Sequence, residues 1–494
     1  MRVLLALALI QALGYLTLRT LAGERFPLRS TESWGLSFGA GSGILSLGLF
    51  YLAYWGVPLT PTNILILAAI LLGGLVVLWI VLAHRTHRPQ TSNSDPSHTV
   101  ETLPLGHPLS AWEWTSLAVV GLCIVIVFVD ALSQPLLAFD ARAIWAFKAK
   151  VLYFEQGIYN EAFLDAERLH AKTRYPQLIP LAETFIASVS GDFHERALKL
   201  LFPCFYVSLI LLVGSELRRA FDRRNALLST SLFASLPVFT IYANGGAASG
   251  HADLPLAFYT AALAAYLFRW LQKGSSGNLR LALLFASLTA FTKTEGLALV
   301  FVVFLATALA AWLLHGRPVR SLWPLPATAL GGLICLAPWF LYQARLPIVD
   351  ENFVRLLTPE NLVGGLNRLP FIVKSLGKEF FLKPHLWSFL GISAAVLLVR
   401  SPKDAIRSRF SVFLWICLLY VAVLCAIFMV IPWKLEELFP VALTRLVMPV
   451  APLLFLWICF ELGNSRLLAG CVNASAHNYP KGAVNSGGAN ALKH

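Results

Sequence analysis

Charged side chains occur at five places in this 494-residue chain where the neighbouring segments are strongly apolar. The five clusters are Asp140 and Arg142 with Lys148, Arg174 and Tyr175, His251 and Asp253, Lys293 and Glu295, and Glu436 and Glu437 with Arg445. An ionisable group beside an apolar helix is costly unless it has a partner. Carboxylates and cations held together can bind a phosphate-bearing lipid headgroup and activate a hydroxyl beside it. Each group taken singly also fits a simple interfacial anchor.

The composition places these clusters in a membrane protein. Hydrophobic residues make up 57% of the chain and charged residues 13%, with a mean hydropathy of +0.69, whereas soluble proteins carry about 25% charged residues. Long apolar segments lie at 3–20, 34–55, 62–83, 114–133, 197–217, 225–243, 254–271, 279–292, 295–314, 322–342, 385–400, 411–432 and 446–462. Because a span needs about 20 apolar residues, the sequence predicts an all-α polytopic membrane protein with about 13 transmembrane helices.

Lysine and arginine gather in the short connectors 218–224, 315–321 and 400–410, which the positive-inside rule assigns to the cytoplasm. Counting spans outward from these connectors places all five clusters on the opposite face. The outer connectors are 134–196, 244–253, 343–384 and 433–445. The count holds only if 177–190 does not cross the membrane, so we expect that segment to lie on, or dip into, the outer leaflet.

Two of the outer connectors carry apolar residues at helical spacing. After Asp140 the apolar stripe consists of Ile144, Phe147, Val151, Phe154 and Ile158. The segment 366–382 repeats this design. The pattern predicts amphipathic juxtamembrane helices that lie at the interface with their cations at headgroup depth, or that only cap the bundle.

The chain divides into four parts by composition. We expect three N-terminal transmembrane helices in 1–83, a cytoplasmic linker at 84–113, a transmembrane core at 114–462 and a disordered cytoplasmic tail at 463–494. The first apolar run has a weak n-region and no convincing cleavage site, so it is interpreted as a retained helix. The net charge of +13 is spread over membrane connectors, which argues against nucleic-acid binding.

The order of these features resembles a known family. A carboxylate follows an early span, Tyr175-Pro176 follows in the outer loop, and Asp253 heads a later span. A Lys293-Thr294-Glu295-Gly296 turn comes next, and Arg445 precedes a final helix that contains two prolines. This order resembles the GT-C superfamily of membrane glycosyltransferases over residues 114–462. The bacterial protein-mannosyltransferase-like and lipid A aminoarabinose-transferase-like branch is the most similar.

The resemblance implies a polyprenyl-phosphate-linked sugar as donor, a hydroxyl acceptor on the extracytoplasmic face, and inversion at the anomeric carbon. It implies that Asp140 acts as catalytic base or orients the acceptor, with Asp253 as the second outer-face carboxylate. Two departures leave the metal and the acceptor class open. Many members carry paired acids where this chain has Asp140-Ala141-Arg142, and a double proline where it has Tyr175-Pro176-Gln177.

The other candidates divide by charge. The cations that we expect to bind the donor phosphate are Lys293 and Arg445, followed by Arg142, Lys148 and Arg174. Glu295, His251 and Tyr175 are candidates for acceptor binding or support. A divalent metal is possible if Glu295 or Glu437 completes a site with Asp140 and Asp253.

The sequence leaves other functions open. Besides a glycosyltransferase of the bacterial inner membrane with a periplasmic active site, it fits a transporter or flippase, a polysaccharide polymerase or ligase, and a membrane scaffold. Transport requires ionisable groups or broken helices near the bilayer midplane, whereas these clusters lie at one boundary. The expected partners are the polyprenyl-phosphate sugar, the lipid bilayer and an unspecified hydroxyl acceptor, without nucleic acid.

Overall fold

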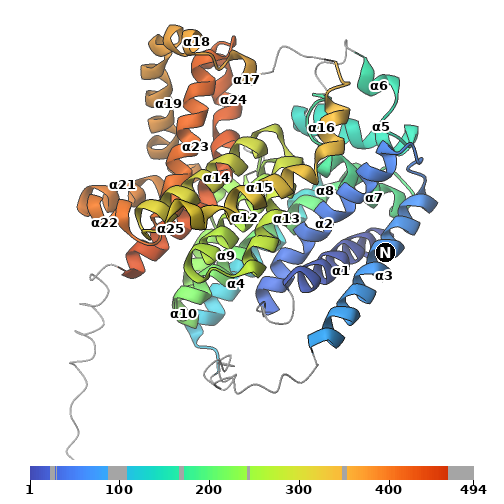
Figure 1. Ribbon diagram of the computed structural model, residues 1–494, viewed down its shortest axis with the longest axis horizontal. Coiled ribbons are helices and arrows are strands. Elements are labelled where there is room, and N and C mark those ends of the chain that lie inside the picture. Colours follow the sequence, from blue (N-terminus) through green and yellow to red (C-terminus); the bar gives the residue numbers. More distant parts are fainter. Residues whose placement is uncertain are drawn as a thin grey trace, which may run out of the picture.

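The structure is a computed structural model that describes residues 1–22, 28, 30–86, 108–165, 172–241, 245–347 and 353–464. In these ranges every regular element is a helix (Figure 1). The predicted all-α membrane fold is therefore confirmed. The predicted tail, apart from its first two residues, and residues 87–107 of the predicted linker lie outside the described residues.

Nine helical segments of the described chain are long and apolar enough to cross a membrane, and each overlaps a predicted span. They are α1 (Arg2–Ala22), α2 (Ser30–Tyr54), α3 (Pro61–Thr86), α4 (Ala111–Ser133), α8 (Glu195–Lys199) with α9 (Leu201–Ala220), α12 (Asp253–Lys273), α14 (Thr294–Leu313), α23 (Ser411–Val430), and α24 (Leu435–Val447) with η6 (Met448–Val450) and α25 (Ala451–Asn464). A tenth span is possible where η4 (Val319–Leu322) and α15 (Pro324–Ile334) meet α16 (Ala337–Gln343) at a bend of 54°.

Three predicted spans correspond to shorter helices. The segment 225–243 holds α10 (Arg223–Ala234) and α11 (Pro237–Thr240), 279–292 falls in α13 (Ser276–Thr292), and 385–400 holds α20 (Pro384–Trp387) and α21 (Leu390–Arg400). A straight span needs about 20 residues, and the longest of these helices has 17. The count of 13 therefore stays a prediction.

The N-terminal helices pack tightly onto the rest of the molecule through glycines. A Cβ atom on Gly14 of α1 would lie 1.7 Å from the carbonyl oxygen of Ser37, and one on Gly41 of α2 would lie 1.8 Å from that of Ile10. Only glycine permits this approach, which is the small-residue packing common between membrane helices. Helix α2 in turn packs against α9.

Helix α12 lies at the centre of the bundle (Figure 1). Its apolar stretch is fully buried inside the molecule, and α9, α13 and α14 pack around it. Asp253 begins this helix, and Arg269 is buried near its other end. Each end of the central helix therefore places a charged side chain among its neighbours.

The connectors that are predicted to lie on the outer face contain short helices. The connector 134–196 contains η1 (Ala141–Ala146), α5 (Phe147–Glu155), α6 (Glu161–Leu164) and α7 (Leu178–Ser190). The connector 343–384 contains α17 (Phe353–Leu356), α18 (Pro359–Gly364), η5 (Leu366–Arg368) and α19 (Leu369–Leu382). The predicted stripe after Asp140 forms η1 and α5, although Phe154 is exposed. Helix α7 covers the segment 177–190, and its residues 178–188 are buried against α1, α2 and α5.

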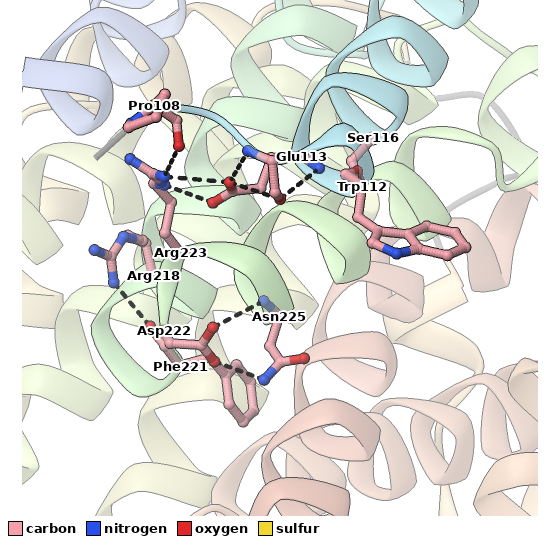
Figure 2. A network of polar contacts seen from close by, with 10 residues as sticks. Pro108, Trp112, Glu113, Ser116, Arg218, Phe221, Asp222, Arg223 and Asn225 are labelled. Carbon is pink, nitrogen blue, oxygen red and sulfur yellow. Dashed lines mark hydrogen bonds and ion pairs between the residues drawn. The ribbon is translucent and has the colours of Figure 1, made fainter.

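A polar network joins the start of α4 to the start of α10 (Figure 2). Ser110 and Glu113 form a capping box at α4, and Nε of Arg223 donates to Glu113 at 2.5 Å. Asp222 caps α10 through the backbone N–H of Asn225. The network joins α4, which follows the predicted cytoplasmic linker, to α10, which follows the predicted cytoplasmic connector 218–224. In the predicted cytoplasmic connector 400–410, a short helix α22 (Pro402–Arg407) follows α21.

Candidate active site

A chain of ion pairs joins residues from four of the five predicted clusters. Nη1 of Arg445 donates to Oδ2 of Asp140 at 2.7 Å, and Nε of Arg445 donates to Oδ2 of Asp253 at 3.0 Å. Nζ of Lys293 donates to Oδ1 of Asp253 at 2.9 Å and lies 2.9 Å from Oε1 of Glu295. Arg445 is therefore shared by two carboxylates that are far apart in sequence.

Helix ends hold these side chains in place. Asp140 lies between α4 and η1, and Arg445 lies in the last turn of α24. Asp253 and Glu295 lie in the first turns of α12 and α14, where the helix dipole stabilises a negative charge. Lys293 has an extended backbone between α13 and α14, and its buried side chain reaches Asp253 at the start of α12.

Two glycines allow the backbone to pass close to the site, one beside the ion pairs and one beside apolar side chains. Gly245 has a positive φ of 81°, and a Cβ atom there would lie 3.1 Å from Cγ of Arg445 and 3.4 Å from Oδ2 of Asp253. Gly250 has φ 82° and faces Ala141 and Leu136. The backbone of the predicted glycine-rich turn therefore lies directly against the site. Asn244 of this turn lies outside the described residues.

The two aspartates differ in accessibility. The side chain of Asp140 is 32% exposed and that of Asp253 is 1% exposed. Asp253 forms ion pairs with both Lys293 and Arg445, whereas Asp140 forms an ion pair with Arg445. The carboxylate of Asp140 is therefore accessible from outside, while that of Asp253 is enclosed by its ion pairs.

The buried groups around the aspartates have shifted acidities. Burial alone lowers the pKa of Lys293, but the carboxylates of Asp253 and Glu295 more than offset this effect, so its pKa is raised and the ammonium stays charged. Burial, and then the charge of Arg445, lowers the pKa of His251 to about 4. His251 is therefore a neutral imidazole at physiological pH, and its Nδ1 has no hydrogen-bond partner among the described residues.

The structure places the remaining predicted cations in other environments. Lys148 is buried under the rings of Trp145 and Tyr175, at 5.4 and 5.5 Å, and donates to the carbonyl of Tyr175 at 3.3 Å. Burial lowers the pKa of Lys148. Arg174 donates to the carbonyl of Leu346 at 3.1 Å. These two side chains support the loop around Tyr175 and are outside the ion-pair chain.

Three further predicted side chains lie on the surface. Arg142 and Glu436 are exposed. Glu437 is 74% exposed and lies 3.4 Å from Lys434. Of the fifth predicted cluster, Arg445 is the residue that reaches the site.

Sequence reasoning missed Lys172, whose charge interacts with Asp140 and Glu295. Its Nζ lies 5.4 Å from the ring of Trp433, which lies two residues before the start of α24. Tyr175 also interacts electrostatically with Glu295, although burial is the main reason that its pKa is raised. No spacing in the sequence singled out Lys172 or Trp433, because their proximity depends on two loops that are far apart in the chain.

The carboxylates do not fit a divalent cation in this arrangement. Oδ2 of Asp140 and Oδ2 of Asp253 each accept a hydrogen bond from Arg445, so the guanidinium occupies the position between them that a bridging cation would need. Glu437 points elsewhere, paired with Lys434. The described residues contain no group of three or more His, Cys, Asp or Glu side chains suited to a metal ion.

Comparison with known proteins gives one match. Residues 175–342 match the family model of the dolichyl-phosphate-mannose-protein mannosyltransferases. The matched part begins at Tyr175 and includes Asp253, Lys293 and Glu295, while Asp140 and Arg445 lie outside it. The searches of curated proteins and of solved structures found no match. Together with the all-helical membrane fold, the family match supports a GT-C-like membrane glycosyltransferase, of the mannosyltransferase type.

Proposed function

We propose that the protein transfers a sugar from a polyprenyl-phosphate-linked donor to a hydroxyl acceptor at the outer membrane face, with inversion of the anomeric carbon. The family match supports the donor class. The observation that carries the proposal is the partly exposed carboxylate of Asp140, which is bound to the same guanidinium as the enclosed Asp253.

The proposed reaction is a single displacement. The acceptor oxygen forms a bond to the anomeric carbon, the bond between that carbon and the phosphate oxygen breaks, and the polyprenyl phosphate leaves with the electron pair. Asp140 takes the hydroxyl proton as the new bond forms, a role that typically contributes about 10²–10⁴-fold to a rate. Because phosphate is a good leaving group, the departing oxygen needs cations more than it needs an acid.

Arg445 supplies the first cation. A guanidinium has five N–H donors, and the contacts of Arg445 to Asp140 and Asp253 use Nη1 and Nε. Its Nη2 donates to no residue in the described part of the chain, so it is available for a phosphate oxygen. Lys293 lies behind Asp253 and keeps that carboxylate in place, and its charge adds to the field at the same point.

Lys172 supplies a further positive charge near Asp140, since its charge interacts with both Asp140 and Glu295. Asp140, Asp253 and Glu295 carry three negative charges, which Arg445, Lys293 and Lys172 balance. A donor phosphate therefore enters a site whose fixed charges already cancel. The charge-assisted hydrogen bonds from Arg445 then direct the phosphate.

The direct test uses purified protein in nanodiscs and a panel of polyprenyl-phosphate sugars. We expect at least one donor to be consumed, with release of polyprenyl phosphate, and the product to have the anomeric configuration opposite to that of the donor. A protein that binds none of these donors and consumes none contradicts the proposal and favours the transporter or flippase interpretation.

A further inference from the structure

A cavity of about 650 Å³ lies apart from the ion-pair chain, at the outer end of α23. One wall is formed by α18 and η5, with Glu360, Asn361 and Asn367. The opposite wall is apolar and runs from Met429 to Pro432, where α23 ends. In Figure 1, α18 and α19 lie next to α23 and α24 at one end of the molecule.

Arg368 and Gly365 fix the shape of this cavity. Arg368 donates to the carbonyl oxygens of Phe428, Ile431 and Trp433, at 3.3, 2.6 and 3.1 Å. A Cβ atom on Gly365 would lie 2.3 Å from the carbonyl oxygen of Met429, so only glycine allows this approach. The side chain of Arg368 and the close approach at Gly365 therefore hold the two walls together.

The lining chemistry argues against a phosphate and for a sugar. Arg368 is the one cation of the lining, and its Nη1 and Nη2 already donate to backbone carbonyls, while the lining carboxylate of Glu360 would repel an anion. Asn361 donates through Nδ2 to the carbonyl of Leu356, which leaves its Oδ1 as an acceptor. Carboxylate and carboxamide groups pair with neighbouring hydroxyls, and an apolar wall suits the C–H face of a sugar ring. The volume lies within the range of small-molecule sites, about 300–1,000 Å³.

The cavity is linked to the catalytic centre by the segment from Ile431 to Trp433. The Ile431 end lines the cavity. The ring of Trp433 at the other end lies over Nζ of Lys172, whose charge interacts with Asp140. This segment therefore runs from the cavity to a side chain whose charge interacts with Asp140.

From this arrangement we infer that the cavity binds a neutral saccharide unit of the acceptor and so directs its hydroxyl toward Asp140. The inference rests on the proposed glycosyl transfer and deepens it, because it assigns the acceptor class to a site distinct from the donor phosphate site.

Two glycines offer a matched pair of variants. Gly364 lines the cavity, and Gly377 lies on α19 outside its lining. A Cβ atom on either would meet nothing within 4 Å, and neither has a positive φ. Gly364→Trp therefore fills the cavity without a backbone clash, while Gly377→Trp adds the same side chain elsewhere on the outer face.

The first experiment measures binding of methyl glucoside, methyl mannoside and methyl galactoside to full-length protein in nanodiscs, by saturation-transfer difference NMR without donor. We expect a signal for at least one glycoside with the wild type and with Gly377→Trp, and a loss of at least about tenfold in affinity with Gly364→Trp. No binding to the wild type, or equal binding to Gly364→Trp, overturns the inference. Binding of serine- or threonine-containing peptides alone also overturns it, because the acceptor class is then a peptide.

The second experiment separates this inference from the proposed function. Hydrolysis of the donor without an acceptor, and transfer of the sugar to the glycoside, are measured with the wild type, Gly364→Trp and Gly377→Trp. We expect Gly364→Trp to consume and bind the donor as the wild type does, while the KM for the glycoside rises at least about tenfold. Absence of donor binding by the wild type contradicts the proposed function. An unchanged KM for the glycoside in Gly364→Trp contradicts only the acceptor site.

Discussion

Arg445 satisfies two carboxylates with one guanidinium, and the two carboxylates have different surroundings. Asp253 is enclosed and also bound by Lys293, so its charge is compensated from two sides. Asp140 is about one-third exposed and depends on Arg445. This asymmetry at residue scale agrees with the proposed division of roles, in which the accessible carboxylate is the base and the enclosed one holds the cation.

The first prediction concerns Asp140→Asn. The amide oxygen still accepts a hydrogen bond from Arg445, so folding and donor binding are retained, but the amide cannot take the hydroxyl proton. We expect turnover to fall at least about a hundredfold, in line with the loss of a general base. Donor turnover and donor affinity are measured together with thermal stability. Near-normal turnover excludes Asp140 as the base and makes Asp253 the next candidate.

The second prediction concerns Arg445→Ala. Losing a charged hydrogen bond to the donor phosphate costs about 1.5–3 kcal/mol, which corresponds to roughly 10–150-fold in donor affinity. The variant also leaves Asp253 with one cation fewer, so thermal stability is measured in parallel. Arg142→Ala is the control, because Arg142 is exposed and outside the ion-pair chain. Unchanged donor affinity and turnover in Arg445→Ala removes this residue from the site.

At the scale of elements, α19 sets the orientation of the helix that carries Arg445. Glu379 of α19 is buried and accepts hydrogen bonds from the hydroxyl of Thr444 at 2.5 Å and from the indole N–H of Trp387 at 3.0 Å. Nζ of Lys383 donates to its other oxygen at 2.6 Å. Because Thr444 precedes Arg445 in α24, this contact fixes the rotation that points the guanidinium at the aspartates.

The third prediction tests this positioning role with two substitutions at one residue. Thr444→Val keeps the shape and removes the hydroxyl donor, so we expect kcat to fall by about tenfold, the equivalent of about 1.4 kcal/mol in a hydrogen bond to a charged acceptor. Thr444→Ser keeps the donor and should retain near-normal kcat. Equal loss in both variants, or a change in stability without a change in kcat, contradicts a positioning role.

At the scale of the whole molecule, charged groups gather at both ends of α12. At the end opposite Asp253, Arg269 binds Glu32 and Glu216, and Tyr266 donates to Glu32 at 2.7 Å. Sixteen residues separate Asp253 from Arg269, which is roughly 24 Å at the rise of an α-helix. This separation is close to the thickness of a bilayer core, so the two clusters suit opposite membrane faces.

The same contacts connect the N-terminal helices to the core. Glu32 belongs to α2 and binds both Arg219 of α9 and Arg269 of α12. Removal of one partner from a buried ion pair typically costs about 3–5 kcal/mol. The three N-terminal helices are therefore packed as part of the bundle in the structure.

The fourth prediction concerns orientation in the membrane. In a variant without native cysteines, single cysteines at positions 165 and 360 should react with an impermeant reagent added to intact cells. Cysteines at 222 and 404 should be protected until the membrane is opened, because they adjoin the cationic connectors. Labelling of position 222 from outside contradicts the topology and removes the argument that places the site on the outer face.

Local features of the sequence determined the membrane class and the places where charge occurs. Apolar runs of bilayer length and the positions of lysine and arginine are local features that can be seen without the fold. They were enough to propose the helical fold and the candidates Asp140, Asp253, Lys293 and Arg445. The family resemblance, which the match over 175–342 supports, added the expected chemistry.

Only the tertiary structure decided which of these charges meet. Arg445 and Asp140 are 305 positions apart, and their contact depends on how α24 packs near the end of α4. The same packing buried Lys148, left Arg142 on the surface and brought Lys172 close to Asp140. A side chain's type and local spacing do not specify its partner when that partner lies on another helix, because helix packing sets the distance between them.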